Sequence, residues 1–261
     1  YAVLYESTGR LGGFDRPRYG HFLDDVLYLE KHYFSDPNYL KIDGRPVMFI
    51  YLTREYFRNR GHDELAEVRR RVSSLYIVGD DVFGPDYQAD WARQFNAVTS
   101  YDVYGQSTGI HRATRRAVKT LAGNYAHARK AANSAGAAFV PAAAPGYSDT
   151  AEREGHPGTP RYFVDEALSQ EGDLFRAMIG EAALPNLDDR CGRLMMVTSF
   201  NEWYEASQIE ATAGTAAATS QDSSASKSQY TGGDRYVDYG PLYLDILHDA
   251  TAGVAAKARN G

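Results

Sequence analysis

Six short apolar runs occur along the chain, and each is followed by a longer segment with helical character. Within each run the apolar residues are continuous and do not alternate with polar ones. Strands that are buried on both faces of a parallel sheet have this pattern, whereas strands with one solvated face alternate. We therefore predict buried strands at Ala2–Tyr5, Val47–Leu52, Leu75–Val78, Ala97–Ser100, Ala137–Ala142 and Leu194–Phe200.

The segments between these runs place apolar residues at helical spacing. The predicted helices are His21–Tyr33, His62–Val72, Arg112–Ala135, Tyr162–Ala183 and Gly240–Ala255. A repeated strand–helix order indicates an α/β fold with right-handed crossovers. The pattern itself is compatible with a doubly wound open sheet and with a TIM barrel, which has eight βα units.

The composition narrows the class of protein. The 261 residues fit a single α/β barrel domain over 1–261, and 43% hydrophobic residues are enough to fill its core. The net charge of −6 argues against nucleic acid as a partner, and no apolar run approaches the ~18 residues of a membrane span. The single cysteine, Cys191, excludes an internal disulfide. The 20 tyrosines suit a sugar-like ligand, because tyrosine combines an apolar face with a hydroxyl group.

Two segments depart from the regular pattern. The first apolar run begins at the second residue, so we expect that a part of the domain upstream of Tyr1 is absent from this chain. Residues 211–229 are rich in Ala, Ser and Thr, and we predict a low-complexity loop there.

Polar side chains directly follow each predicted strand. In parallel α/β folds the carboxyl ends of the strands converge on the active site. A single polar residue at such a place is ordinary for a loop, but a series rich in carboxylates and tyrosines favours one shared site. The series consists of Glu6, Thr53, Arg54, Asp80, Asp81, Tyr101, Asp102, Tyr104, Tyr147, Asp149, Asn201, Glu202 and Glu205.

The densest group of candidate residues is the segment Ser199–Glu210, which reads SFNEWYEASQIE. Glu202 and Glu205 are three residues apart, so one helical turn after the strand would bring their Cβ atoms within roughly 5–6 Å of each other. Two neighbouring carboxylates can divide the roles of acid and base, because proximity and burial separate their pKa values. With Trp203 and Asn201 beside them, this is the composition of a glycosidase site. The alternative is a solvated acidic turn.

Other chemistries find no support in the sequence. The seven histidines form no HxxxH or HxH pair, so we expect no metal site. Asp80 and Asp81 could bind a cation or cap the following helix. Motifs for a serine nucleophile or a phosphate-binding glycine loop are missing, and we expect no cofactor.

The segment Ser199–Glu210 resembles the hallmark of glycoside hydrolase family 99 and its bacterial family 99-like relatives, the endo-α-mannosidase and mannanase group, which reads approximately SFNEWHEGTQIEP. The segments Ile42–Tyr51, Asn96–Gly105, Pro145–Arg153 and Tyr243–Asp245 also agree with that family. The resemblance implies a (β/α)8 barrel of the TIM type with its site at the C-terminal face. Aligned on these segments, the chain begins at the family's third strand, so its six predicted strands are six of eight.

The resemblance also implies a retaining mechanism on an oligo- or polysaccharide with α-linked, mannan-like sugars. Glu202 would remove the proton of the sugar 2-hydroxyl, whose oxygen attacks C1 to give a 1,2-anhydro sugar. Glu205 would protonate the leaving oxygen and then activate the water that opens the epoxide. No metal or cofactor is required. The implied substrate-binding residues are Glu6, Tyr101, Tyr104, Tyr147, Asp149, Arg153, Asn201, Trp203, Tyr204 and Gln208.

Four positions depart from the family pattern. Tyr204 stands where the family has His, Ala206 where it has Gly, Ser207 where it has Thr, and Ala211 where it has Pro. Alanine in place of glycine at 206 reduces the backbone freedom beside the catalytic turn. Two further functions stay open: modification or transfer of glycan in surface polysaccharide biosynthesis, as in a related group with a similar motif, and glycan binding by a non-catalytic barrel.

Overall fold

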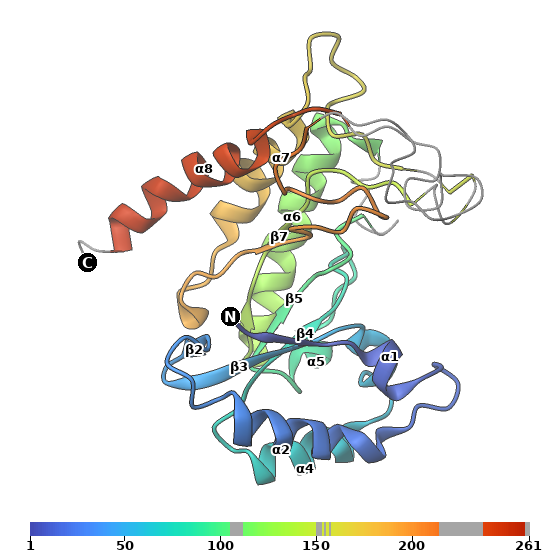
Figure 1. The fold of residues 1–261 in the computed structure, drawn as a ribbon, viewed down its shortest axis with the longest axis vertical. Helices are drawn as coiled ribbons and strands as arrows, with labels where there is room; N and C mark the ends of the chain where they lie inside the picture. The colour runs from blue at the N-terminus through green and yellow to red at the C-terminus, as the bar shows by residue number, and fades with distance from the viewer. Residues whose placement is uncertain (105–111, 150–152, 154, 157, 214–236, 259–261) are drawn as a thin grey trace. The chain divides into compact units, whose positions relative to one another are not determined.

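The computed structural model describes residues 1–104, 112–149, 153, 155–156, 158–213 and 237–258 (Figure 1). The chain divides into two compact units, which are described separately. Unit 1 consists of Tyr1–Tyr101, Tyr125–Pro141 and Asn186–Leu194, and unit 2 consists of Asp102–Asn124, Ala142–Pro185 and Met195–Gly261.

Unit 1 is built on a six-stranded sheet. Its strands are β1 (Val3–Tyr5), β2 (Lys41–Ile42), β3 (Arg45–Ile50), β4 (Tyr76–Asp80), β5 (Ala97–Thr99) and β6 (Ala138–Phe139). The order β1-β3-β4-β5-β6 is parallel throughout, and β2 pairs antiparallel with β3. Each parallel strand joins beside its predecessor, without the reversal of order that defines a doubly wound sheet. This order confirms the predicted α/β fold of the (β/α) barrel type.

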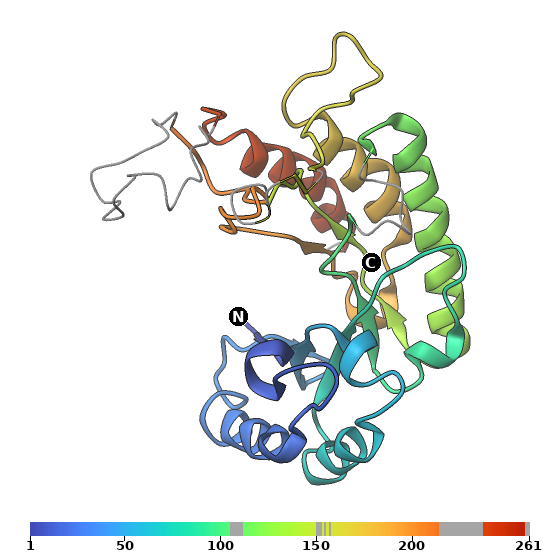
Figure 2. The same cartoon turned by 90° about the vertical axis from the view of Figure 1, so that its right-hand side faces the viewer.

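Helices pack on this sheet. The helical elements of unit 1 are α1 (Ser7–Leu11), the 3-10 turn η1 (Tyr19–His21), α2 (Phe22–His32), α3 (Thr53–Tyr56), α4 (His62–Arg71), α5 (Ala89–Ala92) and the 3-10 turn η6 (Asp189–Cys191). Within unit 1, α2 and α4 lie side by side against one face of the sheet (Figures 1 and 2). Phe22 and Val26 of α2 and Leu65 and Val68 of α4 are buried there, so the apolar stripes predicted for both helices form part of the core.

Strands β3 and β4 confirm the prediction of burial on both faces, whereas Leu4 of β1 is 47% exposed. All five residues of β4 are buried, and in β3 only Arg45 is partly exposed. Alternating residues of a strand point to opposite faces, so a run without exposed positions requires cover on both sides. One member of this buried run is charged: Asp80, the last residue of β4.

Unit 2 contains less regular structure. Its elements are β7 (Ala142–Ala143), α7 (Asp173–Ala177), the π-helical η4 (Met178–Ala183), the 3-10 turn η5 (Leu184–Asn186), β8 (Met196–Val197) and α8 (Leu242–Ala258). The long helix α6 (Arg115–Ser134) contributes residues to both units, because the division falls between Asn124 and Tyr125. Strands β7 and β8 pair in parallel, and the ring of Phe175 on α7 lies 5.6 Å from that of Tyr243 on α8.

The predicted strand Ala137–Ala142 is in fact two strands, β6 and β7, which belong to different sheets. Pro141 lies between them and has no backbone N–H to continue a ladder. The run Leu194–Phe200 likewise contains only the short strand β8. The residues that follow β8 are used instead in the turn described below.

The predicted helix Tyr162–Ala183 begins only at Asp173. Before that residue, Ser169 Oγ accepts the backbone N–H of Phe163 at 2.8 Å, and Asp173 accepts that of Gln170 at 2.8 Å, so these side chains fold the chain into a loop. Of the predicted loop 211–229, residues 214–229 lie outside the described residues. Among the helices that are described, none is long and apolar enough to cross a membrane.

Candidate active site

The segment Ser199–Glu210 folds back on itself directly after β8. Ser199 N donates to Ser207 O at 2.9 Å, and Ser207 N donates to Glu202 O at 3.1 Å. Ser199 Oγ accepts the backbone N–H of Glu202 at 2.7 Å. These bonds close a compact turn that carries both Glu202 and Glu205.

No helix forms at residues 202–205, which lie in a turn. Ala206, which follows Glu205 directly, has a left-handed backbone with φ of 45° and ends this turn. Ala206 N donates to Trp203 O at 3.1 Å, and the chain then reverses through Ser207. The negative charge of Glu202 acts on the carboxyl group of Glu205 and raises its pKa.

Glu205 is half-buried, and its surroundings favour the protonated form. Burial raises the pKa of its carboxyl group above the ordinary value, and the negative charges of Glu202, Asp149 and Asp102 raise it further. The positive charge of Arg153 opposes them. A carboxyl group whose pKa is raised in this way is suited to give a proton to a leaving group.

A second carboxyl group, Asp149, is buried but has the opposite shift. His156 Nδ1 lies 2.6 Å from its Oδ1, and Arg153 Nη1 lies 2.9 Å from its Oδ2. Burial opposes ionisation, but hydrogen bonds from Tyr147 and His156, together with Arg153, lower the pKa of Asp149 below its ordinary value. Asp149 therefore supplies a fixed negative charge that helps to keep Glu205 protonated.

The loop that carries Asp149 is attached to the turn. Ser148 N donates to the carbonyl oxygen of Glu205 at 2.8 Å. Tyr147, on the other side of Ser148, forms an antiparallel bridge with Thr159 through hydrogen bonds of 3.0 and 2.6 Å. The position of Asp149 relative to Glu205 is therefore set by backbone bonds.

Aromatic side chains gather on the same loop. The ring centroid of Tyr147 lies 5.5 Å from that of Tyr104 and 6.2 Å from that of His156. Tyr104 N donates to Asp102 Oδ1 at 3.1 Å, so the segment with Tyr104 also places the Asp102 charge that acts on Glu205. The structure thus brings the predicted residues Tyr104, Tyr147, Asp149 and Arg153 together around Glu205.

The other predicted residues of the turn differ in exposure. Asn201 and Tyr204 are exposed, and Trp203 Nε1 donates to Glu210 Oε2 at 3.1 Å. Gln208 is only 2% exposed. Asn201 and Tyr204 are therefore open to a ligand, whereas Gln208 supports the turn from inside.

Two predicted site residues, Glu6 and Tyr101, belong to unit 1. The Glu6 side chain caps α1 by accepting the backbone N–H of Thr8 at 3.0 Å. Tyr101 N donates to Asp80 Oδ1 at 2.6 Å, and its ring packs against that of Tyr51 with centroids 5.1 Å apart. Both residues therefore have structural roles within unit 1.

Asp80 neither caps the next helix nor sits in a group of metal ligands. Its Oδ2 accepts the N–H of Leu52 at 2.9 Å, and its Oδ1 accepts that of Tyr101. Burial raises the pKa of Asp80 to about 7, although these amides and Arg54 oppose the shift. The neighbouring Asp81 pairs with the Arg58 guanidinium at 2.5 Å. Among the described residues, no three His, Cys, Asp or Glu side chains are grouped so as to hold a metal.

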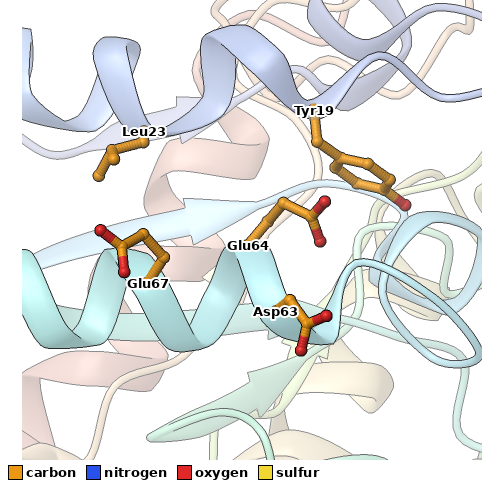
Figure 3. Close-up of a pocket in the computed structure, with 5 residues that line it drawn as sticks. All are labelled: Tyr19, Leu23, Asp63, Glu64 and Glu67. Atoms are coloured by element: carbon orange, nitrogen blue, oxygen red, sulfur yellow. The ribbon is translucent and has the colours of Figure 1, made fainter.

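A cavity of about 220 Å³ opens in unit 1 between α2 and α4 (Figure 3). It is lined by Tyr19, Leu23, Asp63, Glu64 and Glu67. Glu67 is held by the guanidinium of Arg70, with hydrogen bonds of 2.8 and 2.5 Å. None of the residues that the sequence singles out lies in this cavity, so it is separate from the candidate active site.

The sequence analysis misses two residues of the site, His156 and Arg161. His156 has no metal-ligand spacing, and its only signal is its position in the polar loop that carries Asp149. Arg161 Nη2 donates to the carbonyl oxygen of Ala206 at 2.7 Å. This contact joins residues 45 positions apart, so no local pattern reveals it.

The chain is similar in structure to solved glycoside hydrolases. One is a GH99 endo-α-mannosidase from Bacteroides thetaiotaomicron in complex with bis-tris-propane, with a TM-score of 0.66, 20% identity, and coverage of 100% of this chain and 71% of that chain. A second structure of the GH99 endo-α-mannosidase from the same organism has a TM-score of 0.61 and 19% identity, and the match covers 95% of this chain and 66% of that chain. A glycoside hydrolase-like protein has a TM-score of 0.61 and 17% identity, and the match covers 88% of this chain and 60% of that chain.

At the level of sequence, no family model and no curated protein matches the chain. The structural similarity covers nearly all of this chain, whereas the chain spans 60 to 71% of those neighbours. At identities of 20% or less, the structural similarity establishes a common fold. The chain therefore has an α/β fold of the (β/α) barrel type, like that of the GH99 glycoside hydrolases.

Proposed function

We propose that the chain acts as a retaining glycosidase on α-linked, mannan-like glycans. Glu202 takes the proton of the sugar 2-hydroxyl, and the freed oxygen attacks C1 while Glu205 gives its proton to the departing glycosidic oxygen. A 1,2-anhydro sugar results. Glu205, now ionised, removes a proton from water as the water oxygen attacks C1, and Glu202 returns its proton to O2. Two inversions at C1 retain the configuration.

The environment of Glu205 carries this proposal. Burial and three neighbouring carboxylates raise the pKa of its carboxyl group, which is the shift that a proton donor to a leaving group needs. Asp149, whose own pKa is lowered by His156 and Arg153, contributes a negative charge to that shift. A merely solvated acidic turn, which the spacing alone permits, would have neither burial nor a fixed charge next to it.

The surrounding side chains suit a carbohydrate. Tyr104 and Tyr147 offer ring faces, and the exposed Asn201 and Tyr204 offer polar groups for hydroxyls. Two of the structural neighbours are named endo-α-mannosidases, and a third is named a glycoside hydrolase-like protein. These names favour α-mannans as the first substrates to test.

The test is hydrolysis of aryl α-mannosides by the natural full-length protein. Phenol is a poor leaving group that needs a proton, and 2,4-dinitrophenol is a good one that does not. We expect Glu205→Gln to lose about 10²–10⁴-fold in kcat/KM on the phenyl glycoside and far less on the dinitrophenyl glycoside. Glu202→Gln should lose similar factors on both, because its base role precedes departure of either group. Proton NMR should show the α anomer first.

Glu64→Gln is a matched control, because Glu64 is a carboxylate of unit 1 outside the site. It should keep the wild-type rates on both glycosides. Wild-type hydrolysis by either site variant, or initial release of the β anomer, would contradict the assigned roles. Calorimetric binding of α-mannan oligosaccharides without release of reducing ends would instead favour the non-catalytic barrel.

A further inference from the structure

Arg161 lies beneath the turn that carries Glu202 and Glu205. Its side chain is 13% exposed, and its Nη2 donates to the carbonyl oxygen of Ala206 at 2.7 Å. Ala206 directly follows Glu205 and has the left-handed φ of 45°. The guanidinium therefore binds the backbone at the most unusual position of the turn.

The surroundings of the guanidinium are specific for arginine. Its central carbon lies 4.8 Å from the ring centroid of Tyr243 and 5.3 Å from that of Tyr239. Glu171 is 3.9 Å from its Nε and also accepts a 2.6 Å hydrogen bond from the Tyr243 hydroxyl. A planar, weakly hydrated guanidinium can stack on aromatic rings while it donates in its plane, whereas a lysine ammonium group cannot.

The aliphatic part of Arg161 packs against the loop that leads to Tyr147. A Cβ atom at Gly146 would collide with Cγ of Arg161, so the glycine at this position makes room for the side chain. Ser148, two residues later, donates to the carbonyl oxygen of Glu205. Two successive carbonyl groups, those of Glu205 and Ala206, are thus held by separate donors.

The left-handed backbone at Ala206 needs such support. An L-residue other than glycine in this conformation costs about 1–2 kcal/mol, and it persists only where its surroundings fix it. If the donor to the Ala206 carbonyl is lost, the residue can relax toward a right-handed conformation. Because Glu205 is its immediate neighbour, that relaxation would move the Glu205 carboxyl group.

We propose that Arg161 is a positioning residue for Glu205: its bond to the Ala206 carbonyl holds the turn in the conformation that places the proton donor. This inference rests on the proposed glycosidase function. Arg161 touches no sugar in this role and acts through the backbone. The effect of its loss should therefore fall on proton transfer by Glu205 and not on substrate binding.

Arg161→Lys tests this role in the natural full-length protein. On phenyl α-mannoside we expect kcat to fall about 100-fold with KM changed less than threefold, since a misplacement of about 1 Å can cost that much. On 2,4-dinitrophenyl α-mannoside, which needs no proton donor, the loss should be less than tenfold. Amide hydrogen exchange at Ser148 and Ser207 should become faster, because their N–H groups bond to the Glu205 and Glu202 carbonyls.

Two further variants keep the test decisive. Tyr39→Phe removes the buried 2.9 Å hydrogen bond to the Val47 carbonyl in unit 1 and leaves Arg161 and its partners unchanged, so it controls for loss of stability and should keep the wild-type ratio of the two rates. If Arg161→Lys does not fold, Glu171→Gln, which weakens the orientation of the guanidinium, should give a smaller change in the same direction. If Arg161→Lys loses the same factor on both glycosides, or loses no activity, the positioning role is wrong. The proposed glycosidase function is tested separately by Glu205→Gln. If the wild type hydrolyses neither glycoside, the exchange rates decide: unchanged rates at Ser148 and Ser207 in Arg161→Lys overturn the positioning role.

Discussion

Asp80 in unit 1 and Glu205 in unit 2 both have raised pKa values, but their oxygens are used differently. Asp80 is 2% exposed, and each of its oxygens accepts a backbone N–H, from Leu52 and Tyr101. Glu205 is half-buried, and no described residue hydrogen-bonds its carboxyl group. Burial shifts both pKa values upward, but only Glu205 has oxygens left for a substrate.

The supporting structure differs in the same way. Asp80 ends a strand in which every residue is buried, so regular sheet structure fixes it. Glu205 sits on an irregular turn, which is held by the amide of Ser148 and the side chain of Arg161. A perturbed pKa marks a candidate reactive group, and the saturation of its oxygens separates a structural carboxylate from a reactive one.

The largest expected effect is the pH dependence of stability that Asp80 causes. Its pKa is about 7 in the folded protein, against an ordinary value of 3.8 that the unfolded chain should retain, so between these values the folded protein holds a proton that the unfolded chain releases. The contribution of Asp80 to the free energy of unfolding is complete below about pH 4 and is lost as the pH rises to 7, by up to about 4 kcal/mol. Urea unfolding from pH 4.5 to 8 should show this fall in the wild type and a much flatter curve in Asp80→Asn. If the free energy of unfolding depends on pH equally in the wild type and in Asp80→Asn, the raised pKa of Asp80 is contradicted.

A somewhat smaller effect is expected from Asp80→Ala. This change leaves the buried N–H groups of Leu52 and Tyr101 without acceptors, so the free energy of unfolding at pH 5 should fall by about 3 kcal/mol. Glu205→Gln removes no hydrogen bond, and its free energy of unfolding should stay within about 1 kcal/mol of the wild type. Asp86→Ala, at an exposed carboxylate of unit 1, is the control and should change it by less than about 0.5 kcal/mol. Equal losses in Asp80→Ala and Glu205→Gln would remove the distinction between the two groups.

The regular part of the fold follows from the sequence, because local patterns determine it. Continuous apolar runs predict β3 and β4, and helical spacing predicts α2, α4 and α6 to within a few residues. The prediction fails where side chains that bind backbone amides override the helical spacing of the apolar residues. Ser169 and Asp173 bind backbone amides and fold the first half of the predicted helix 162–183 into a loop, in which Leu168 is 91% exposed.

The sequence singles out the residues proposed for the site, but it does not predict how they are held together. The carboxylate pair and the loop with Tyr147 and Asp149 are readable as motifs, but their assembly depends on contacts between distant positions. The bond from Arg161 to the Ala206 carbonyl and that from Ser148 to the Glu205 carbonyl are examples. The left-handed backbone at Ala206 is not predictable from the spacing of the glutamates, because these contacts and not local propensity hold it.

The smallest predicted effect concerns Ala206 itself. Ala206→Gly removes the cost of a Cβ atom in the left-handed region, about 1–2 kcal/mol, but adds freedom to the unfolded chain, so the free energy of unfolding should rise by about 0.5–1 kcal/mol. Ala126→Gly, on the exposed side of α6, is the matched control and should lower it by about the same amount, because glycine is unfavourable inside a right-handed helix. Chemical denaturation of both variants measures whether the free energy of unfolding rises or falls in each. A loss of stability in both would mean that the turn does not hold Ala206 in the left-handed conformation, and the contrast with the regular backbone around Asp80 would disappear.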